Sequence, residues 1–292
     1  MELQWPLIIF TTLVTWSAGL FGTQALLATR GEAAKAQMTA WVVSAVLLGI
    51  GGVAVFFHLE HWERIFNGFG HITSGITQEL IAIVMLALVA IAYLVAMRKS
   101  SDGSTVPAWL GWVSVIVSVV FVLVVAHSYL MAARPAWDTV LWVLYMLGNA
   151  LAFGPLTMAV IMASVGDDLT PVAMPAIVGA AAAVVASVAF GSFLSMAGSS
   201  FVEIGYYFDP TQPSAGMVDA SSMLANSIPL VWGGAVAVGA VVPMVCALLA
   251  RRKGDPASWK IGGSIAVACV LVGAVCMRVA FYSAGLSVFM LY

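Results

Sequence analysis

Eight long apolar stretches divide this chain, and they leave few folds open to it. They cover residues 5–28, 39–58, 77–97, 108–131, 139–164, 172–198, 226–250 and 259–282. Each approaches or exceeds the roughly 20 residues with which a helix crosses ~30 Å of bilayer hydrocarbon. In lipid every backbone N–H and C=O group must pair internally, and segments this long and continuous favour helices over a barrel. The sequence therefore predicts an all-α integral membrane protein, a bundle of eight transmembrane helices.

The composition agrees with this class. The chain is 62% hydrophobic and 8% charged, with a mean hydropathy of +1.06, which excludes a soluble domain of ordinary make-up. No basic tract indicates a nucleic-acid partner. The first residues lack a basic segment and lead into a stretch too long for a cleaved signal, so we interpret them as the first helix. Residues 1–292 are expected to form a single eight-helix integral membrane domain.

The basic residues predict how the bundle is oriented. Eight of the eleven lysines and arginines lie after the first, third and seventh stretches or just inside the eighth. These are Arg30, Lys35, Arg98, Lys99, Arg251, Arg252, Lys253 and Lys260. Because lysine and arginine concentrate in cytoplasmic loops, we expect these loops in the cytoplasm and both termini outside it. The chain is then a multi-pass protein of the cytoplasmic (inner) membrane of a cell.

All four histidines lie in or beside the loops on the predicted outer side: His58, His61, His71 and His127. The densest polar run spans residues 58–67, and Glu79 follows at the start of the third stretch. A short connection makes the second and third helices antiparallel neighbours. His58 and Glu79 are therefore expected at similar depth, near one outer mouth of the bundle.

This run of residues favours proton chemistry. Charged groups at membrane depth are costly, so a dense group of them usually serves a function or faces water. A histidine that titrates near neutral pH, beside a carboxylate leading to water, can remove protons from a hydroxylated ring. Arg64, between His58 and Glu79, could hold a carboxylate or orient a ligand oxygen. The alternative is an interfacial loop whose charges are simply solvated.

A second candidate pair lies near the outer end of the last stretch. Arg278 and Tyr282 are four residues apart and so share a helix face. They could line a ligand pocket, or Arg278 could extend toward the lipid head groups. His127 is interpreted as a hydrogen-bonded interfacial residue rather than a ligand.

Several short motifs occur in a recognisable order along the chain. They are Trp5-Pro6-Leu7, His58-Leu59, Arg64, Phe66-Asn67, Glu79, Gly154-Pro155-Leu156, and Arg278 with Phe281-Tyr282. In this order they resemble the membrane-anchor subunit of dimethyl sulfoxide reductase, the DmsC family. The resemblance spans the whole chain, including eight helices with both termini outside.

The resemblance implies an anchor and quinol-oxidising subunit that acts as an oxidoreductase only within a complex. Such a subunit passes electrons from menaquinol to a four-cluster iron–sulfur subunit, which serves a molybdopterin catalytic subunit in anaerobic respiration. Both partners would dock on the extracytoplasmic face.

By the same resemblance, His58 and Glu79 align with positions tied to menaquinol binding and oxidation, and Arg64 matches the arginine of the same run. Asn67, His61, Arg278 and Tyr282 are expected as further quinol contacts. This chain departs from the family pattern at residues 60–62, where Glu-His-Trp replaces a small stretch that contains Gly and Pro.

Two other functions compete with this one. In a haem b cytochrome, His58 and His127 would ligate the iron as an axial pair, but the resembled family lacks haem. A secondary transporter would bind its substrate near the bilayer midplane, where this chain has almost no ionisable groups. Cys246, Cys269 and Cys276 show no C-x-x-C spacing, so we expect no iron–sulfur cluster or other metal site in the chain itself.

Overall fold

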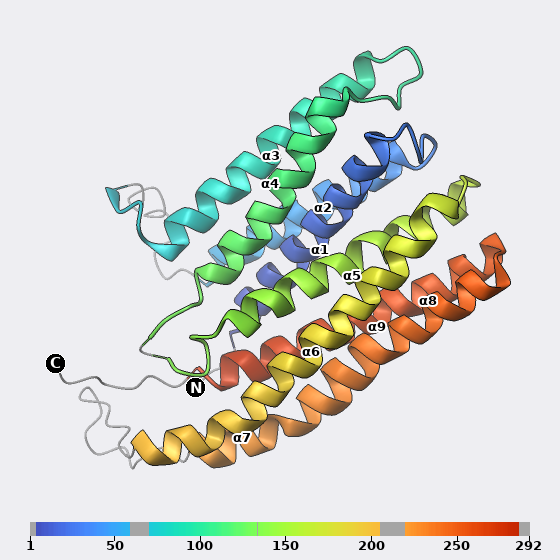
Figure 1. Cartoon of the computed structure of the whole chain (residues 1–292). Coiled ribbons are helices and arrows are strands. Elements are labelled where there is room, and N and C mark those ends of the chain that lie inside the picture. The colour runs from blue at the N-terminus through green and yellow to red at the C-terminus, as the bar shows by residue number, and fades with distance from the viewer. Residues whose placement is uncertain (1–3, 59–69, 133, 205–219, 286–292) are drawn as a thin grey trace.

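The computed structural model describes residues 4–58, 70–132, 134–204 and 220–285 (Figure 1). Within these ranges eight helical segments are long and apolar enough to cross a membrane, and no strand is present. The helices are α1 (Trp5–Ala28), α2 (Gln37–Phe56), α3 (Gly75–Lys99), α4 (Ala108–His127), α5 (Val140–Val165), α6 (Thr170–Ile204), α7 (Ala220–Pro229), η2 (Leu230–Val241), α8 (Val242–Lys253) and α9 (Pro256–Ser283). The predicted all-α class and its eight apolar helices are confirmed, whereas the orientation across the membrane stays a prediction.

The helices run back and forth between two ends of the bundle (Figure 1). We call them the His58 end, where α2 and α4 stop and α3 and α5 start, and the Arg30 end, where α1 stops and α2 starts. Helix α1 starts and helix α9 stops at the His58 end.

Local signals in the sequence fix several helix boundaries. The Asp255 carboxylate accepts a hydrogen bond from the backbone N–H of Ser258 at 2.8 Å, and Pro256 opens α9 with a ring that suits the first helical turn. Gly166 (φ 67°) ends α5 and Gly254 (φ 70°) ends α8 in the left-handed conformation that glycine adopts without a steric penalty.

Helix α5 forms the centre of the bundle, and α3 lies at its edge. In α5, 83% of the membrane-spanning residues are buried inside the bundle, whereas in α3 only 17% are. Helix α5 packs against α1, α6 and α9. A Cβ on Gly154 of α5 would lie 2.2 Å from the carbonyl oxygen of Gly19 in α1. Glycine at this position therefore lets the two backbones touch, as small residues do between membrane helices.

The seventh span differs from a plain α-helix. Its middle segment, η2, is π-helical, and prolines 229 and 243 lie at its two ends. Each proline lacks the N–H that would continue the α-helical bonding pattern, so wider turns form between them. Gly239 of η2 packs on Gly273 of α9, where an added Cβ would lie 2.4 Å from the Gly273 Cα.

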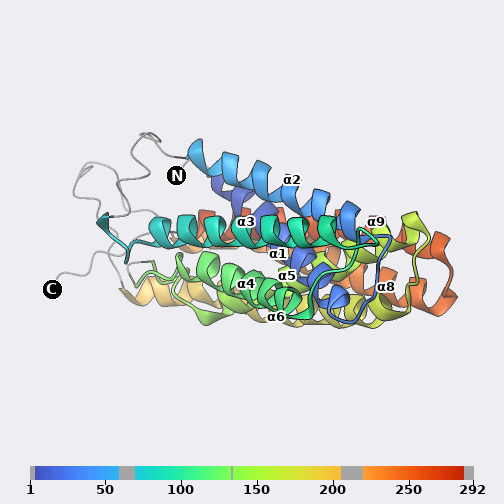
Figure 2. The same ribbon diagram turned by 90° about the horizontal axis from the view of Figure 1, so that it is seen from above.

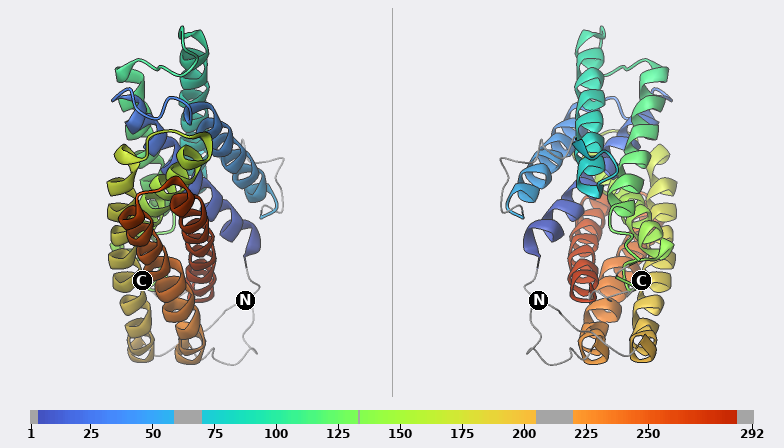
Figure 3. Two further views of the ribbon diagram at one scale, coloured as in Figure 1. Left: turned by 90° about the vertical axis from the view of Figure 1, so that its right-hand side faces the viewer. Right: turned by 90° about the vertical axis from the view of Figure 1, so that its left-hand side faces the viewer.

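Helices α2 and α3 touch near the Arg30 end and diverge toward the His58 end (Figures 2 and 3). Two hydrogen bonds join their nearer halves. Trp41 Nε1 donates to the Ala90 carbonyl at 2.8 Å, and the Tyr93 hydroxyl donates to Gln37 Oε1 at 2.9 Å. These polar groups pair with each other because lipid offers no partner. In the other half the two helix backbones lie farther apart.

The contact between α1 and α5 gives a test of this packing. Gly154→Val should lower the free energy of unfolding by about 3 kcal/mol, because the new side chain would overlap the α1 backbone. Gly49→Val is the matched control, since a Cβ at Gly49 meets nothing within 4 Å. Thermal unfolding of the detergent-purified variants is the measurement. Equal melting temperatures for both would contradict the packing described here.

Candidate functional site

A cavity of about 350 Å³ lies at the His58 end, within the ~300–1,000 Å³ typical of small-molecule sites. Four parts of the chain form it: the start of α1, the end of α2, the start of α3 and the connection between α4 and α5. The lining residues are Gln4, Leu7, Val55, His58, Ser74, Gly75, Ile76, Glu79, Ser128, Tyr129, Met131, Arg134 and Trp137. The divergence of α2 from α3 makes room for it.

His58 lies two residues beyond the last residue of α2, Phe56, rather than ending that helix as the sequence predicted. Its backbone N–H donates to the Val55 carbonyl at 3.1 Å, which extends the turn and holds the residue at the cavity wall. Partial burial lowers the pKa of the His58 imidazole below its ordinary value. Near neutral pH the ring is therefore mostly uncharged and ready to accept a proton.

Glu79 lies on α3 across the same cavity and is only 7% exposed. Its carboxylate accepts a hydrogen bond from the Ser128 hydroxyl, in the turn that follows α4. Gly75 makes this approach possible, because a Cβ there would lie 3.1 Å from the Ser128 Cβ. His58 and Glu79, which the sequence predicts at one mouth of the bundle, line the same cavity in the structure. Their chemical roles stay predictions.

Ser128 has two acceptors for its single hydroxyl proton. Besides the Glu79 carboxylate, the Val125 carbonyl lies 2.9 Å from Ser128 Oγ. A serine hydroxyl donates one hydrogen bond and accepts others. It can donate to Glu79 when that group is charged, or accept from a protonated Glu79 while donating to Val125. Either form of the carboxyl group then has a partner.

The third wall comes from the connection between α4 and α5. The guanidinium carbon of Arg134 lies 4.4 Å from the centroid of the Trp137 ring, a cation–π contact. Trp137 Nε1 donates to the Phe281 carbonyl at 2.7 Å and so ties this connection to α9. Among the described residues no carboxylate pairs with Arg134, which leaves a positive charge at the cavity wall.

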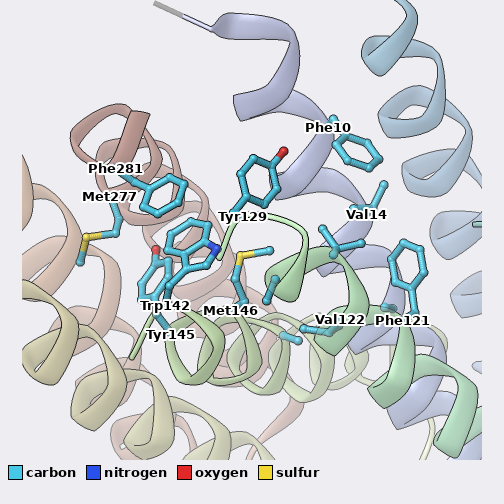
Figure 4. Packing of buried hydrophobic residues seen from close by; sticks show 14 of the residues in the cluster. Phe10, Val14, Phe121, Val122, Tyr129, Trp142, Tyr145, Met146, Met277 and Phe281 are labelled. Atoms are coloured by element: carbon cyan, nitrogen blue, oxygen red, sulfur yellow. The ribbon is translucent and has the colours of Figure 1, made fainter. Parts of the chain in front are cut away.

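A stack of aromatic rings supports this wall. Phe281 lies between Trp137 and Trp142, with ring centroids 4.7 Å and 3.7 Å away and nearly parallel planes. Tyr129 meets Trp137, Trp142 and Phe281 edge-on, and Figure 4 shows it near Trp142 and Phe281. Offset and edge-on ring contacts of this kind stabilise a packed core beyond the area they bury. The cavity wall is therefore rigidly backed.

Arg278 lies inside the bundle rather than at its surface. It is fully buried, so it neither extends toward the lipid head groups nor lines the cavity, and Tyr282 does not line the cavity either. Arg278 donates to Thr11 Oγ1 at 2.9 Å and to Asn149 Oδ1 at 3.2 Å. These polar groups of α1 and α5 replace the water that a charged side chain would otherwise seek. Both alternatives predicted for Arg278 therefore differ from the structure.

The buried Arg278 is nevertheless close to the cavity. The Thr11 hydroxyl that accepts its Nε–H donates in turn to the Leu7 carbonyl at 2.8 Å, and Leu7 lines the cavity. The Arg278 guanidinium thus lies about one turn of α1 deeper in the bundle than Leu7, which lines the cavity. The described hydrogen-bond partners of Arg278 include no carboxylate that would neutralise its charge.

Three predicted site residues, Arg64, His61 and Asn67, lie outside the described residues, and their roles stay predictions. His71 and His127 are exposed and do not line the cavity, so the axial pair that a haem would need, His58 and His127, does not share it. In the part of the chain that is described, no group of three or more His, Cys, Asp or Glu side chains is arranged to hold a metal ion.

The sequence did not predict the wall formed by Ser128, Tyr129, Arg134 and Trp137. The fourth apolar stretch extends to residue 131, which predicts that Ser128 and Tyr129 lie inside a helix. Helix α4 in fact ends at His127. The signal that could have indicated the wall is the run of polar and aromatic residues from 127 to 138, directly after an apolar helix.

Comparison with known proteins gives two findings. The family described as DMSO reductase anchor subunit (DmsC) matches residues 1–284. A relative, the C subunit of the anaerobic dimethyl sulfoxide reductase of Escherichia coli (strain K12), is 27% identical over 173 residues. That match covers 56% of this chain and 60% of the relative, so it spans less than two thirds of the relative's length.

The contact of α3 with the turn after α4 can be tested by a cysteine pair. Gly75→Cys combined with Ser128→Cys, with the three native cysteines replaced, should form a disulfide under mild oxidation. The Cβ positions are 3.1 Å apart, close to the ~3.5–4.5 Å of natural disulfides. Mass spectrometry of proteolytic fragments detects the linked peptides. Gly49→Cys with Ser128→Cys is the control that should stay reduced. Failure of the first pair to cross-link would contradict this wall of the cavity.

Proposed function

We propose that this chain, which belongs to the DMSO reductase anchor subunit (DmsC) family, is the quinol-oxidising membrane anchor of a molybdoenzyme reductase complex. As a member of this family with eight apolar helices, it is a multi-pass membrane protein. One observation carries the proposal of quinol oxidation. A histidine that can accept a proton and a buried carboxyl group, His58 and Glu79, line the same cavity.

The cavity suits a flat, mostly apolar ring that carries two hydroxyl groups. Leu7, Val55 and Ile76 offer apolar contacts, and Trp137 offers an aromatic face. His58 and Glu79 supply polar atoms from different walls, as two separate hydroxyls require. A quinol dissolved in the bilayer would enter sideways where α2 and α3 diverge (Figure 2). Menaquinol is the quinol that we propose, by resemblance to the family.

In the proposed reaction the quinol loses two protons and two electrons and leaves as the quinone. His58 hydrogen-bonds one hydroxyl and accepts its proton, and Glu79 accepts the other and passes it toward water at the His58 end. The electrons pass one at a time to an iron–sulfur cluster of a partner subunit docked at that end. The partner delivers them to a molybdopterin catalytic subunit. We propose that the His58 end faces away from the cytoplasm.

Two features of the surroundings favour proton removal. Ser128 can stay hydrogen-bonded to Glu79 before and after the carboxyl group takes up a proton. Arg278 lies about one helical turn from the cavity, and no described carboxylate neutralises its charge. This positive charge stabilises negative charge that develops on a quinol oxygen. Only the Ser128 hydroxyl proton has to reorient, from Glu79 to the Val125 carbonyl, while Arg278 keeps its hydrogen bonds.

Substitution of the two proton acceptors tests the function. His58→Gln and Glu79→Gln should each lower quinol-driven reduction by about 100-fold or more, the typical contribution of a general base. Reduction driven by an artificial donor that feeds the catalytic subunit directly should not change, because the complex still assembles. His127→Gln, an exposed histidine outside the cavity, is the control. Normal quinol turnover by both cavity variants would refute the proposal.

The role of Ser128 is visible in the pH dependence. Ser128→Ala removes the donor to the charged form of Glu79, so the acidic limb of the quinol-driven kcat/KM profile should move to higher pH. Ser128→Thr keeps the hydroxyl and should restore the wild-type limb. Ser114→Ala is the matched control, because that buried α4 hydroxyl bonds only the Leu110 carbonyl among described groups. An unchanged profile in Ser128→Ala would remove Ser128 from the mechanism.

A further inference from the structure

A second cavity, of about 280 Å³, lies in the other half of the bundle. It is bounded by α1, α4, α5 and α6, and it shares no lining residue with the cavity at the His58 end. Arg30 is the one charged residue among those that line it. The proposed quinol reaction makes no use of this space.

The length of this cavity matches one leaflet of a bilayer. On the side of α1 its lining runs from Ala18 to Arg30, just past the end of that helix, which at ~1.5 Å per residue spans about 18 Å. Half of the ~30 Å hydrocarbon thickness is about 15 Å. The cavity therefore reaches from the head-group level at the Arg30 end to about the middle of the membrane, which is the depth of one acyl chain.

The walls are suited to hydrocarbon. Val115, Val119 and Val122 form the α4 side, and Gly19, Gly22 and Gly179 line the opposite sides. Gly179 of α6 packs directly on the Leu151 carbonyl of α5, where an added Cβ would lie only 1.9 Å from the oxygen. Pro155 cannot donate to that carbonyl within the helix, which leaves the space that Gly179 occupies. Small side chains thus leave a trough beside α4 that apolar atoms can fill.

The polar groups lie where a head group would. Arg30 is two residues past the end of α1, is exposed, and pairs with no carboxylate among the described residues. A guanidinium matches the geometry of a phosphate and binds it through paired hydrogen bonds. Deeper in the cavity, Ser118 is only 3% exposed and its hydroxyl has no hydrogen-bond partner in the described structure.

We propose that this cavity is a binding site for one phospholipid, with its phosphate on Arg30 and one acyl chain between α4 and the α1–α5–α6 core. Basic residues at the mouths of grooves between membrane helices bind such head groups. The lipid would fill the space between the core and α4. Helix α4 in turn contacts α3 and leads into Ser128 at the far end. The site is independent of the proposed quinol chemistry and would remain if that chemistry were refuted.

The test is the lipid that the purified complex retains. After a detergent wash, native mass spectrometry should find about one phospholipid held per anchor subunit. Val119→Trp should displace it, because this residue lines the cavity and is 45% exposed, so a larger side chain fills the trough without entering the core. Ile116→Trp, on the same helix, 59% exposed and outside the cavity, should retain the lipid.

The head group is tested separately. Arg30→Gln should lower retention of added phosphatidylglycerol at least tenfold, whereas Arg252→Gln at the same end of the bundle should not. Melting temperatures within a few degrees of wild type would establish that the variants are folded. Retention of a quinone in place of a phospholipid, or undiminished phospholipid in Val119→Trp, would overturn the proposal. Loss of the lipid in Ile116→Trp as well would also overturn it, because the effect would not be specific to the cavity.

Discussion

The absence of hydrogen-bond partners in lipid is the constraint on which this structure depends. Several polar groups of the spans therefore pair with one another. Trp41 donates to the Ala90 carbonyl across the α2–α3 interface, and Arg278 is surrounded by oxygen atoms of α1, α5 and α9. Against this background, two groups able to take up protons at the His58 end, His58 and Glu79, are distinguished by facing a cavity. Their position is the basis of the proposed function.

The divergence of α2 and α3 and the turn after α4 together create that cavity. Two described hydrogen bonds, made by Trp41 and Tyr93, join the two helices in the half near the Arg30 end. In the other half, Ser128 bonds Glu79 from the side of α4, and Trp137 joins the wall to α9 through the Phe281 carbonyl. The wall of the cavity on the α4 side is backed by stacked rings.

Much of this architecture could be predicted from the sequence, because apolar length alone identifies helices in a membrane protein. The shared mouth of His58 and Glu79 followed from the short connection between two antiparallel helices. Tertiary contacts decided what was missed. Helix α4 ends at His127, where Ser128 turns to Glu79, and no local residue pattern indicates that bond. Arg278 lies inward because Thr11 and Asn149, distant in sequence, solvate it. The π-helical segment η2 depends on the packing of Gly239 against Gly273 as well as on two prolines.

Binding of a quinol at the His58 end is the central claim, and photoaffinity labelling of the assembled complex tests it most directly. An azido-naphthoquinone analogue, applied in the membrane and competed with unlabelled menaquinone, should modify peptides that contain residues 55–58, 74–79 and 128–137. These segments surround one cavity although they are far apart in the sequence. Competed labelling confined to other segments, such as the cavity beside Arg30, would contradict the account.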